Sequence, residues 1–277
     1  LWMTLGHEIR PLQLEHKLRE WIKALNGTIL DTESNPDTLR NQLAELLKNK
    51  ACLLILDDVW DKVPLETFQV AGSNCRIIFS TRDAEIARET GAKIQSVDVM
   101  SNDMAIELLD KWSQGYLQET PRQYKEWIID SIGALPLAIK LAGAQLQTKT
   151  TEDWLKTFET RKLKSKRPAA NNSHDSIEDT FALSINSLEE NDRRLYVALS
   201  IFATWEIPEQ SILNVWEELS QLDTESGKDL LTDLVSRALC DLQIHDDTGE
   251  RTIILHPLLK SLLFNKLDQT ERQDLHR

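Results

Sequence analysis

Two adjacent carboxylates, Asp57 and Asp58, follow an apolar run in the segment LLILDDVW (Leu53–Trp60). An apolar run without alternation indicates a strand covered on both faces, as in a parallel sheet between helices, and a buried helix segment fits the same pattern. In open α/β sheets, ligands bind at the carboxyl ends of the strands. If the run is a strand, its direction brings both acids to that edge, where they suit a metal–nucleotide ligand.

Arg82 follows a second apolar segment, CRIIFS, and one threonine. A strand there places Arg82 at the same carboxyl edge, where a planar guanidinium can bind a terminal phosphate. The alternative is that Thr81 and Asp83 begin a helix and leave Arg82 as a surface cation. Taken alone, Pro136 in GALPLA fits a helix start, and His256 at the end of an apolar strand fits a satisfied core histidine.

The composition is that of an ordinary globular protein, and 277 residues are enough for two domains or three small ones. The formal net charge of −13 disfavours a general phosphate-backbone binder, because nonspecific nucleic-acid affinity needs a basic surface. Three scattered cysteines, Cys52, Cys75 and Cys240, predict buried free thiols in a reducing compartment. No apolar stretch reaches the roughly 18 residues that span a bilayer, so we expect a cytoplasmic protein without a membrane segment.

Strands and helices alternate in the first hundred residues, which indicates a parallel α/β sheet. The predicted strands are LWMTLG (1–6), LLILDDVW (53–60), CRIIFS (75–80) and KIQSVDV (93–99). The predicted helices lie at 12–25, 36–48 and 81–91, the last ended by Gly91. From Ser101 to about Lys166 the patterns are helical, and the run RKLKSKRPAANNSHDS fits a connector.

The last hundred residues combine helices with a hairpin. Helical patterns occur at 176–188, 192–202, 208–219 and 228–239, and another helix follows Pro257. Between them, CDLQIHDDTGERTIILH holds two alternating runs around Asp247, Thr248 and Gly249, which predicts a β-hairpin. Helices followed by such a wing indicate a winged-helix module.

Together these segments resemble the NB-ARC family, the nucleotide switch of plant resistance proteins, apoptotic protease-activating factors and bacterial signalling ATPases, over essentially the whole chain. LLILDDVW resembles the family's Walker B motif, CRIIFSTRD its sensor motif and GALPLA its GLPLA motif. ILHPLL lies where the family has Met-His-Asp or Leu-His-Asp. The resemblance predicts a P-loop NTPase-like α/β subdomain (1–100), a helical subdomain (101–166) and a winged-helix subdomain (167–277).

The resemblance also implies that ADP or ATP and Mg²⁺ bind to the intact protein. Asp57 would hold Mg²⁺, largely through water, because this ion needs only one or two protein carboxylates. Asp58 would polarise the attacking water as a general base, unless it caps the next segment or faces solvent. Arg82 would sense the γ-phosphate of ATP.

Three further site residues belong to the later subdomains. By resemblance, Leu135 and Pro136 contribute to the nucleotide pocket, and the ring of Pro136 would pack against adenine. His256 would contact the β-phosphate of ADP and close the winged-helix subdomain over the nucleotide. Pro257 stands where the family has an acid, which predicts a weaker ADP-bound lock.

One family motif is absent, because no GxxxxGK[ST] loop occurs in the sequence. In the family this loop precedes the strand that LWMTLG resembles, so we expect a piece that begins after the Walker A loop. Backbone amides and a lysine normally cradle the phosphates, so we expect these 277 residues alone to bind neither ATP nor ADP tightly. The loss of the adjoining strand predicts unpaired sheet edges.

The implied function is a molecular switch, ADP-bound at rest and ATP-bound when active, in a multidomain signalling or defence protein. Slow ATPase activity, flanking effector and repeat-type sensor domains, and a homo-oligomer on activation would accompany it. One alternative is a winged-helix transcriptional regulator, but its recognition helix KDLLTDLVSRALC carries only Lys228 and Arg237 as bases, so nucleic acid is not expected as a partner. Another alternative is an adaptor that has lost its nucleotide chemistry.

Overall fold

The computed structural model describes residues 1–6, 9–28, 35–70, 72–164, 173–245 and 248–267. The chain forms two compact units, Leu1–Val97 and Asp98–Arg277. The predicted division into three subdomains remains a prediction, and its second boundary lies outside the described residues.

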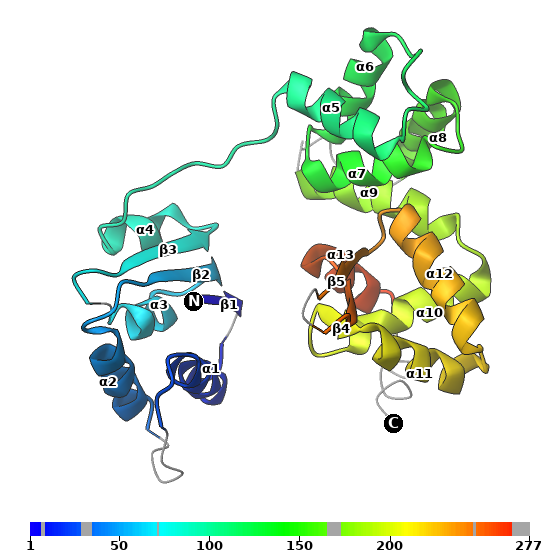
Figure 1. The fold of residues 1–277 in the computed structure, drawn as a ribbon. Coiled ribbons are helices and arrows are strands. Elements are labelled where there is room, and N and C mark those ends of the chain that lie inside the picture. The colour runs from blue at the N-terminus through cyan, green and yellow to red at the C-terminus, as the bar shows by residue number, and fades with distance from the viewer. Residues whose placement is uncertain (7–8, 29–34, 71, 165–172, 246–247, 268–277) are drawn as a thin grey trace. The chain divides into compact units, whose positions relative to one another are not determined.

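The first unit contains a three-stranded parallel sheet with the order β1-β2-β3 (Figure 1). Its strands are β1 (Trp2–Gly6), β2 (Leu53–Val59) and β3 (Arg76–Thr81), and its helices are α1 (Pro11–Ala24), α2 (Pro36–Leu47), α3 (Lys62–Phe68) and α4 (Ala84–Glu89). The predicted parallel sheet is therefore confirmed. Among the described residues, β1 and β3 each pair only with β2, so both outer edges are unpaired.

The hydrophobic core of this unit lies on one face of the sheet. Leu54 and Leu56 of β2 are fully buried and share a core with residues of α1, α2 and α3. On the opposite face Trp2, Leu53 and Ile78 remain exposed. The expectation of a strand covered on both faces is wrong for this unit, because its described helices bury alternate residues of β2 only.

One other prediction for this unit also needs correction. Residues 93–99 form no strand, and Val97 is 94% exposed; alternation alone does not make a strand where no neighbouring strand supplies hydrogen bonds.

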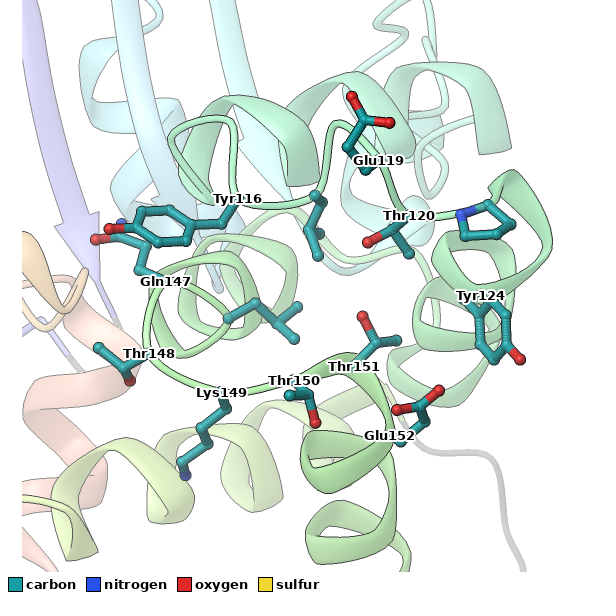
Figure 2. A pocket seen from close by; sticks show the side chains of 13 residues that line it. Tyr116, Glu119, Thr120, Tyr124, Gln147, Thr148, Lys149, Thr150, Thr151 and Glu152 are labelled. Atoms are coloured by element: carbon teal, nitrogen blue, oxygen red, sulfur yellow. The ribbon is translucent and has the colours of Figure 1, made fainter.

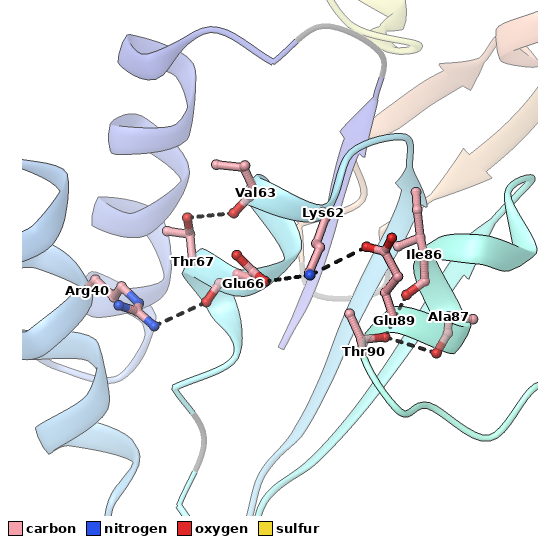
Figure 3. Close-up of polar contacts among 9 residues, drawn as sticks. All are labelled: Arg40, Lys62, Val63, Glu66, Thr67, Ile86, Ala87, Glu89 and Thr90. Carbon is pink, nitrogen blue, oxygen red and sulfur yellow. Dashed lines mark hydrogen bonds and ion pairs between the residues drawn. The ribbon is translucent and has the colours of Figure 1, made fainter.

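Helix α3 was not predicted. Figure 3 shows Lys62 of α3 between Glu66 and Glu89, 3.4 Å from a carboxylate oxygen of each, which links α3 to α4. Arg40 of α2 donates to the Glu66 carbonyl at 3.4 Å, so α3 is tied to both neighbours.

The second unit begins with five helices and continues into a mixed helical and β region. The helices are α5 (Asn102–Trp112), α6 (Arg122–Ile132), α7 (Pro136–Gln145), α8 (Thr151–Lys164) and α9 (Ser173–Asn186). Then follow α10 (Glu190–Ala198), η1 (Leu199–Ile201), β4 (Glu206–Pro208), α11 (Glu209–Ser220), α12 (Thr224–Ser236), β5 (Asp241–Ile244), β6 (Arg251–Ile254) and α13 (Pro257–Phe264). Among the described residues no helix is long and apolar enough to span a bilayer.

The predicted hairpin is present, and β4 adds an unpredicted third strand to give the antiparallel order β4-β6-β5. Two hydrophobic cores fill this unit. One gathers around Trp154 and Ile128 among α5 to α9, and the other around Trp216 and Ile253 in the later region. Helix α7 contributes side chains to both cores, so it joins the two halves of the unit.

Candidate functional site

The end of β2 is irregular where the two predicted site carboxylates lie. The pairing of β2 with β3 shifts register between Leu56 and Val59, and Asp58 adopts a left-handed backbone conformation with φ of 55°. A bulge of this kind re-aims side chains at the end of a strand. Asp57 and Asp58 therefore lie among the last three residues of β2, at the carboxyl end of the strand.

Ser80 of β3 connects the two acids. Its hydroxyl donates to Oδ1 of Asp57 at 2.5 Å and accepts the backbone N–H of Asp58 at 2.8 Å. One hydroxyl thus orients the carboxylate and satisfies the amide that the bulge removes from the ladder. Sequence reasoning missed Ser80, although its place at the end of the neighbouring strand was a usable signal.

The acid pair fits a hydrated Mg²⁺ ion better than a metal held by protein ligands alone. Within the described residues, Oδ2 of Asp57 and both carboxylate oxygens of Asp58 accept no hydrogen bond. No group of three or more His, Cys, Asp or Glu side chains gathers to hold a metal in that part of the chain. Mg²⁺ keeps several waters and commonly uses one or two carboxylates, so Asp57 with its free oxygen suits such an ion.

Arg82 lies beyond the end of β3 and is exposed. Its guanidinium carbon is 5.3 Å from the centroid of the Trp60 ring, a cation–π distance. Asp83 caps α4 by accepting the N–H of Glu85 at 2.8 Å, so the helix start considered as an alternative is present. The cap leaves the guanidinium available, and phosphate sensing by Arg82 remains a prediction.

Leu135 and Pro136 begin α7 in the second unit. The chain turns at Gly133, with φ of 79°, and at Ala134, with φ of 52°, before Leu135 takes the N-cap position and Pro136 the first helical position. Proline suits that position because its missing N–H would have no partner in the helix. The turn exposes Pro136, and its contact with adenine stays a prediction.

His256 is the N-cap of α13, and its Nδ1 accepts the N–H of Leu258 at 3.1 Å. An accepting Nδ1 assigns the ring proton to Nε2, which can donate to an anion. Partial burial of the ring and then the charge of Lys140 lower the pKa of His256, against an opposing effect of Asp241. His256 therefore favours the neutral form at pH 7, and its role as a cap is one that the sequence did not reveal.

The sequence is similar to a known protein family and to several known proteins. Residues 1–115 match the family model of the NB-ARC domain. Residues 1–115 belong to an NB-ARC domain. Human apoptotic protease-activating factor 1 is 28% identical to the NB-ARC chain over 255 residues, which are 90% of this chain and 19% of that protein. The disease resistance protein TAO1 of Arabidopsis thaliana is 29% identical over 243 residues, 84% of this chain and 18% of its own.

A solved structure shares the fold of the NB-ARC chain. It is a signal transduction ATPase with numerous domains (STAND) from Pyrococcus horikoshii that has a tetratricopeptide repeat sensor. It matches 99% of this chain and 38% of its own with a TM-score of 0.58 and 13% identity. The predicted NB-ARC relationship is therefore confirmed for residues 1–115, and the P-loop NTPase-like sheet is confirmed as the fold of the first unit. The chain spans about a fifth of the length of the two curated relatives.

The NB-ARC chain also has a cleft in the helical part of its second unit, of about 550 Å³ (Figure 2). Tyr116, Thr120 and Tyr124 line it from one side and Thr148 and Thr151 from the other. None of the predicted site residues lines this cleft. Its lining holds two acids, Glu119 and Glu152, and one base, Lys149, so it has no excess of positive charge to attract a phosphate anion. The cleft is therefore separate from the candidate nucleotide chemistry.

Proposed function

We propose that this NB-ARC chain is part of a nucleotide-dependent switch, in which ADP maintains a resting state and ATP an active state of a larger signalling or defence protein. The name of the P. horikoshii neighbour, a signal transduction ATPase, and those of the relatives, which concern protease activation and disease resistance, support this class of function. A ligand shifts a conformational equilibrium only by its difference in affinity for the two states. Because ATP differs from ADP by its terminal phosphate, the nucleotide-binding residues must bind that phosphate differently in the two states.

The observation that carries the proposal is the hydrogen-bonded group Asp57–Ser80–Asp58 at the carboxyl end of parallel strands. Mg²⁺, when bound with nucleotide, would neutralise phosphate charge at Asp57. Asp57 would hold the ion through its free oxygen, while Ser80 orients the carboxylate. Asp58 has free oxygens from which it can accept a proton from water, so slow hydrolysis in the intact protein is part of the proposal.

The other predicted site residues would read which nucleotide is present. Arg82 can exchange its contact with the Trp60 ring for a terminal phosphate, because a guanidinium binds phosphate more strongly than an exposed aromatic face. The apolar ring of Pro136 can pack against the adenine of the nucleotide, with Leu135 beside it. His256, neutral and with its proton on Nε2, can donate to a phosphate of ADP. Activation would then involve flanking effector and sensor domains and self-association of the protein in the cytoplasm.

The alternative as a transcriptional regulator gains no support from α12. Asp229 is exposed on this helix, and Arg237 is paired with Asp233 at 2.7 Å. A helix with this charge pattern is a poor surface for a phosphate backbone. The nucleotide switch is the better proposal.

The test uses the full-length protein, with binding of ATP and ADP measured by calorimetry in the presence and absence of Mg²⁺. Asp57→Asn and Ser80→Ala should each weaken Mg²⁺-dependent ATP binding, Ser80→Ala by about tenfold, because an outer-shell partner that orients a metal ligand is lost. Asp61→Asn is the matched control, since Asp61 is an exposed aspartate of the same segment. Equal Mg²⁺-dependent affinities for all four proteins would overturn the proposal.

A further inference from the structure

Lys140 of α7 contacts two elements that are distant in the sequence. Its Nζ lies 3.0 and 3.1 Å from the two carboxylate oxygens of Asp241, the first residue of β5. The same Nζ is 4.6 Å from the centroid of the ring of Trp112, the last residue of α5. The ammonium group is therefore attracted by a carboxylate on one side and by an aromatic ring on the other. This contact joins the helical half of the second unit to its β-hairpin.

The hairpin extends this contact to His256. Asp241 of β5 is the register partner of Ile254 in β6, two residues before His256. Leu255 continues the strand by donating its N–H to the Trp205 carbonyl at 2.8 Å, and His256 then caps α13. Holding β5 against α7 therefore also holds the end of β6 and the start of α13.

We infer that Lys140 is a positioning residue for His256, acting through its ion pair with Asp241. We call this pair the Lys140–Asp241 latch. When the latch is closed, the hairpin and the N-terminus of α13 are fixed to α7, and the imidazole is kept in place for a nucleotide. When it opens, His256 moves with the hairpin. The role assigned to His256 rests on the proposed function, whereas the latch itself rests on the contacts of Lys140.

The exposure of the latch suits a contact that opens and closes. The side chain of Lys140 is 23% exposed and that of Asp241 is 52% exposed. Ion pairs of this kind contribute little to stability, so a modest difference in ligand affinity can outweigh one. The pair Lys125–Asp110 is a useful contrast, because it links α6 to α5 at 2.7 Å with the Lys125 side chain only 9% exposed. That pair joins two helices of the helical half and includes no residue of the hairpin or of α13.

The experiment measures hydrogen exchange of the segment 252–260 and the rate of ADP release in the full-length protein. Lys140→Glu and Asp241→Lys should each raise both quantities, about three- to tenfold, as expected for loss of a partly exposed ion pair and its cation–π contact. The double variant with the charges exchanged rebuilds the ion pair but not the contact with Trp112, so it should restore a large part of both quantities, and Lys140→Arg should retain them. Lys125→Gln, the matched control, should lower thermal stability without changing exchange in that segment.

Unchanged exchange in both single variants overturns the latch. Raised exchange that the double variant does not restore also overturns it, because the two residues then act separately. A third outcome separates the latch from the proposed function. Hydrogen exchange of the segment 252–260 rises in the single variants and is restored in the double variant, but the rate of ADP release is unchanged in the Lys140 variants and in His256→Ala. In that case the latch stands and the proposed role of His256 fails. If His256→Ala alone accelerates release, the positioning role of Lys140 is wrong.

Discussion

At the scale of single residues, one serine organises the candidate site. The Ser80 hydroxyl both donates to the Asp57 carboxylate and accepts the Asp58 amide, and this leaves three of the four acidic oxygens without a partner among the described residues. A residue with no charge of its own therefore decides which oxygen of Asp57 is available. Its importance comes from strand pairing, since β2 and β3 bring residues 57 and 80 to the same edge.

His256 predicts a pH dependence of stability. The folded-state pKa of His256 lies below its ordinary value of 6.5 because of burial and the charge of Lys140. Below pH 6.5 the unfolded chain binds the proton more readily, so this residue's contribution to the free energy of unfolding falls as the pH drops from 6.5 to the folded pKa. Above pH 6.5 the contribution is complete.

Denaturant titrations at pH 7.5 and pH 5.0 test this expectation with His256→Asn. Asparagine can still cap α13 but does not titrate in this range, so the variant should lose less stability on acidification than the natural protein. His16→Asn is the control, because His16 is an exposed histidine that pairs with Glu20 within α1. An identical acid-induced loss in the natural protein and in His256→Asn would contradict the expectation.

At the scale of elements, α7 is the central helix of the second unit. Ala138, Ile139 and Ala142 belong to the core of the helical half, and Leu141 and Ala144 to the core of the later half. Such a helix shows little amphipathic periodicity because almost every side is covered. The same helix begins with Pro136, the residue proposed to contact adenine, and carries Lys140 of the latch. One element therefore serves both the packing of the unit and its proposed function.

Gly143 permits the close approach of α5 to α7. A Cβ atom at this position would lie 2.7 Å from Cβ of Trp112 and 3.2 Å from the carbonyl of Leu109. Both atoms are held by packing, so we expect Gly143→Ala to push α5 outward and to destabilise the second unit by about 1–3 kcal/mol. Chemical denaturation followed by tryptophan fluorescence measures the change.

The matched control for Gly143 is Gly133→Ala. Nothing lies within 4 Å of a Cβ at Gly133, so its cost should come from the positive φ of 79° alone. The α5–α7 contact should then stay intact, together with the position of Trp112 beside Lys140. If Gly143→Ala is as stable as the natural protein, helix packing at this point is looser than the distances indicate.

At the scale of the whole molecule, the chain is divided into two compact units with separate cores. Separate cores favour separate cooperative transitions, because each unit loses its own buried surface when it unfolds. The functional residues are divided in the same way. Asp57 and Arg82 belong to the first unit, and Pro136 and His256 to the second, so their joint action on one nucleotide remains part of the proposal.

Calorimetry should therefore show two thermal transitions. Leu54 is fully buried in the first unit and Leu234 in the second. Leu54→Ala should lower the free energy of unfolding of the first unit by about 2–5 kcal/mol, the usual cost of a cavity at a buried leucine. The transition temperature of the first unit should then fall, while that of the second unit stays unchanged. Leu234→Ala should do the reverse. A single transition that both variants lower equally would show that the units unfold together.

Local patterns in the sequence were sufficient for most of the helices and for the strands that carry the motifs. Helical spacing with a capping residue predicted α2 and α5, and turn residues between alternating runs predicted the hairpin of β5 and β6. These features depend on neighbours within a few residues, which the chain order supplies. The apolar run before Asp57 placed the acids at a strand end for the same reason.

Only the tertiary structure decided which partners those segments meet. Residues 93–99 have strand-like alternation but pair with no strand, and the apolar run of β2 is buried on one face of its unit only. The contacts of Ser80 with Asp57 and of Lys140 with Asp241 join residues 23 and 101 positions apart. Such contacts follow from strand register and helix packing, and no local spacing encodes them. The sequence therefore determined the chemical groups and the family, whereas the folded chain determined how those groups are held.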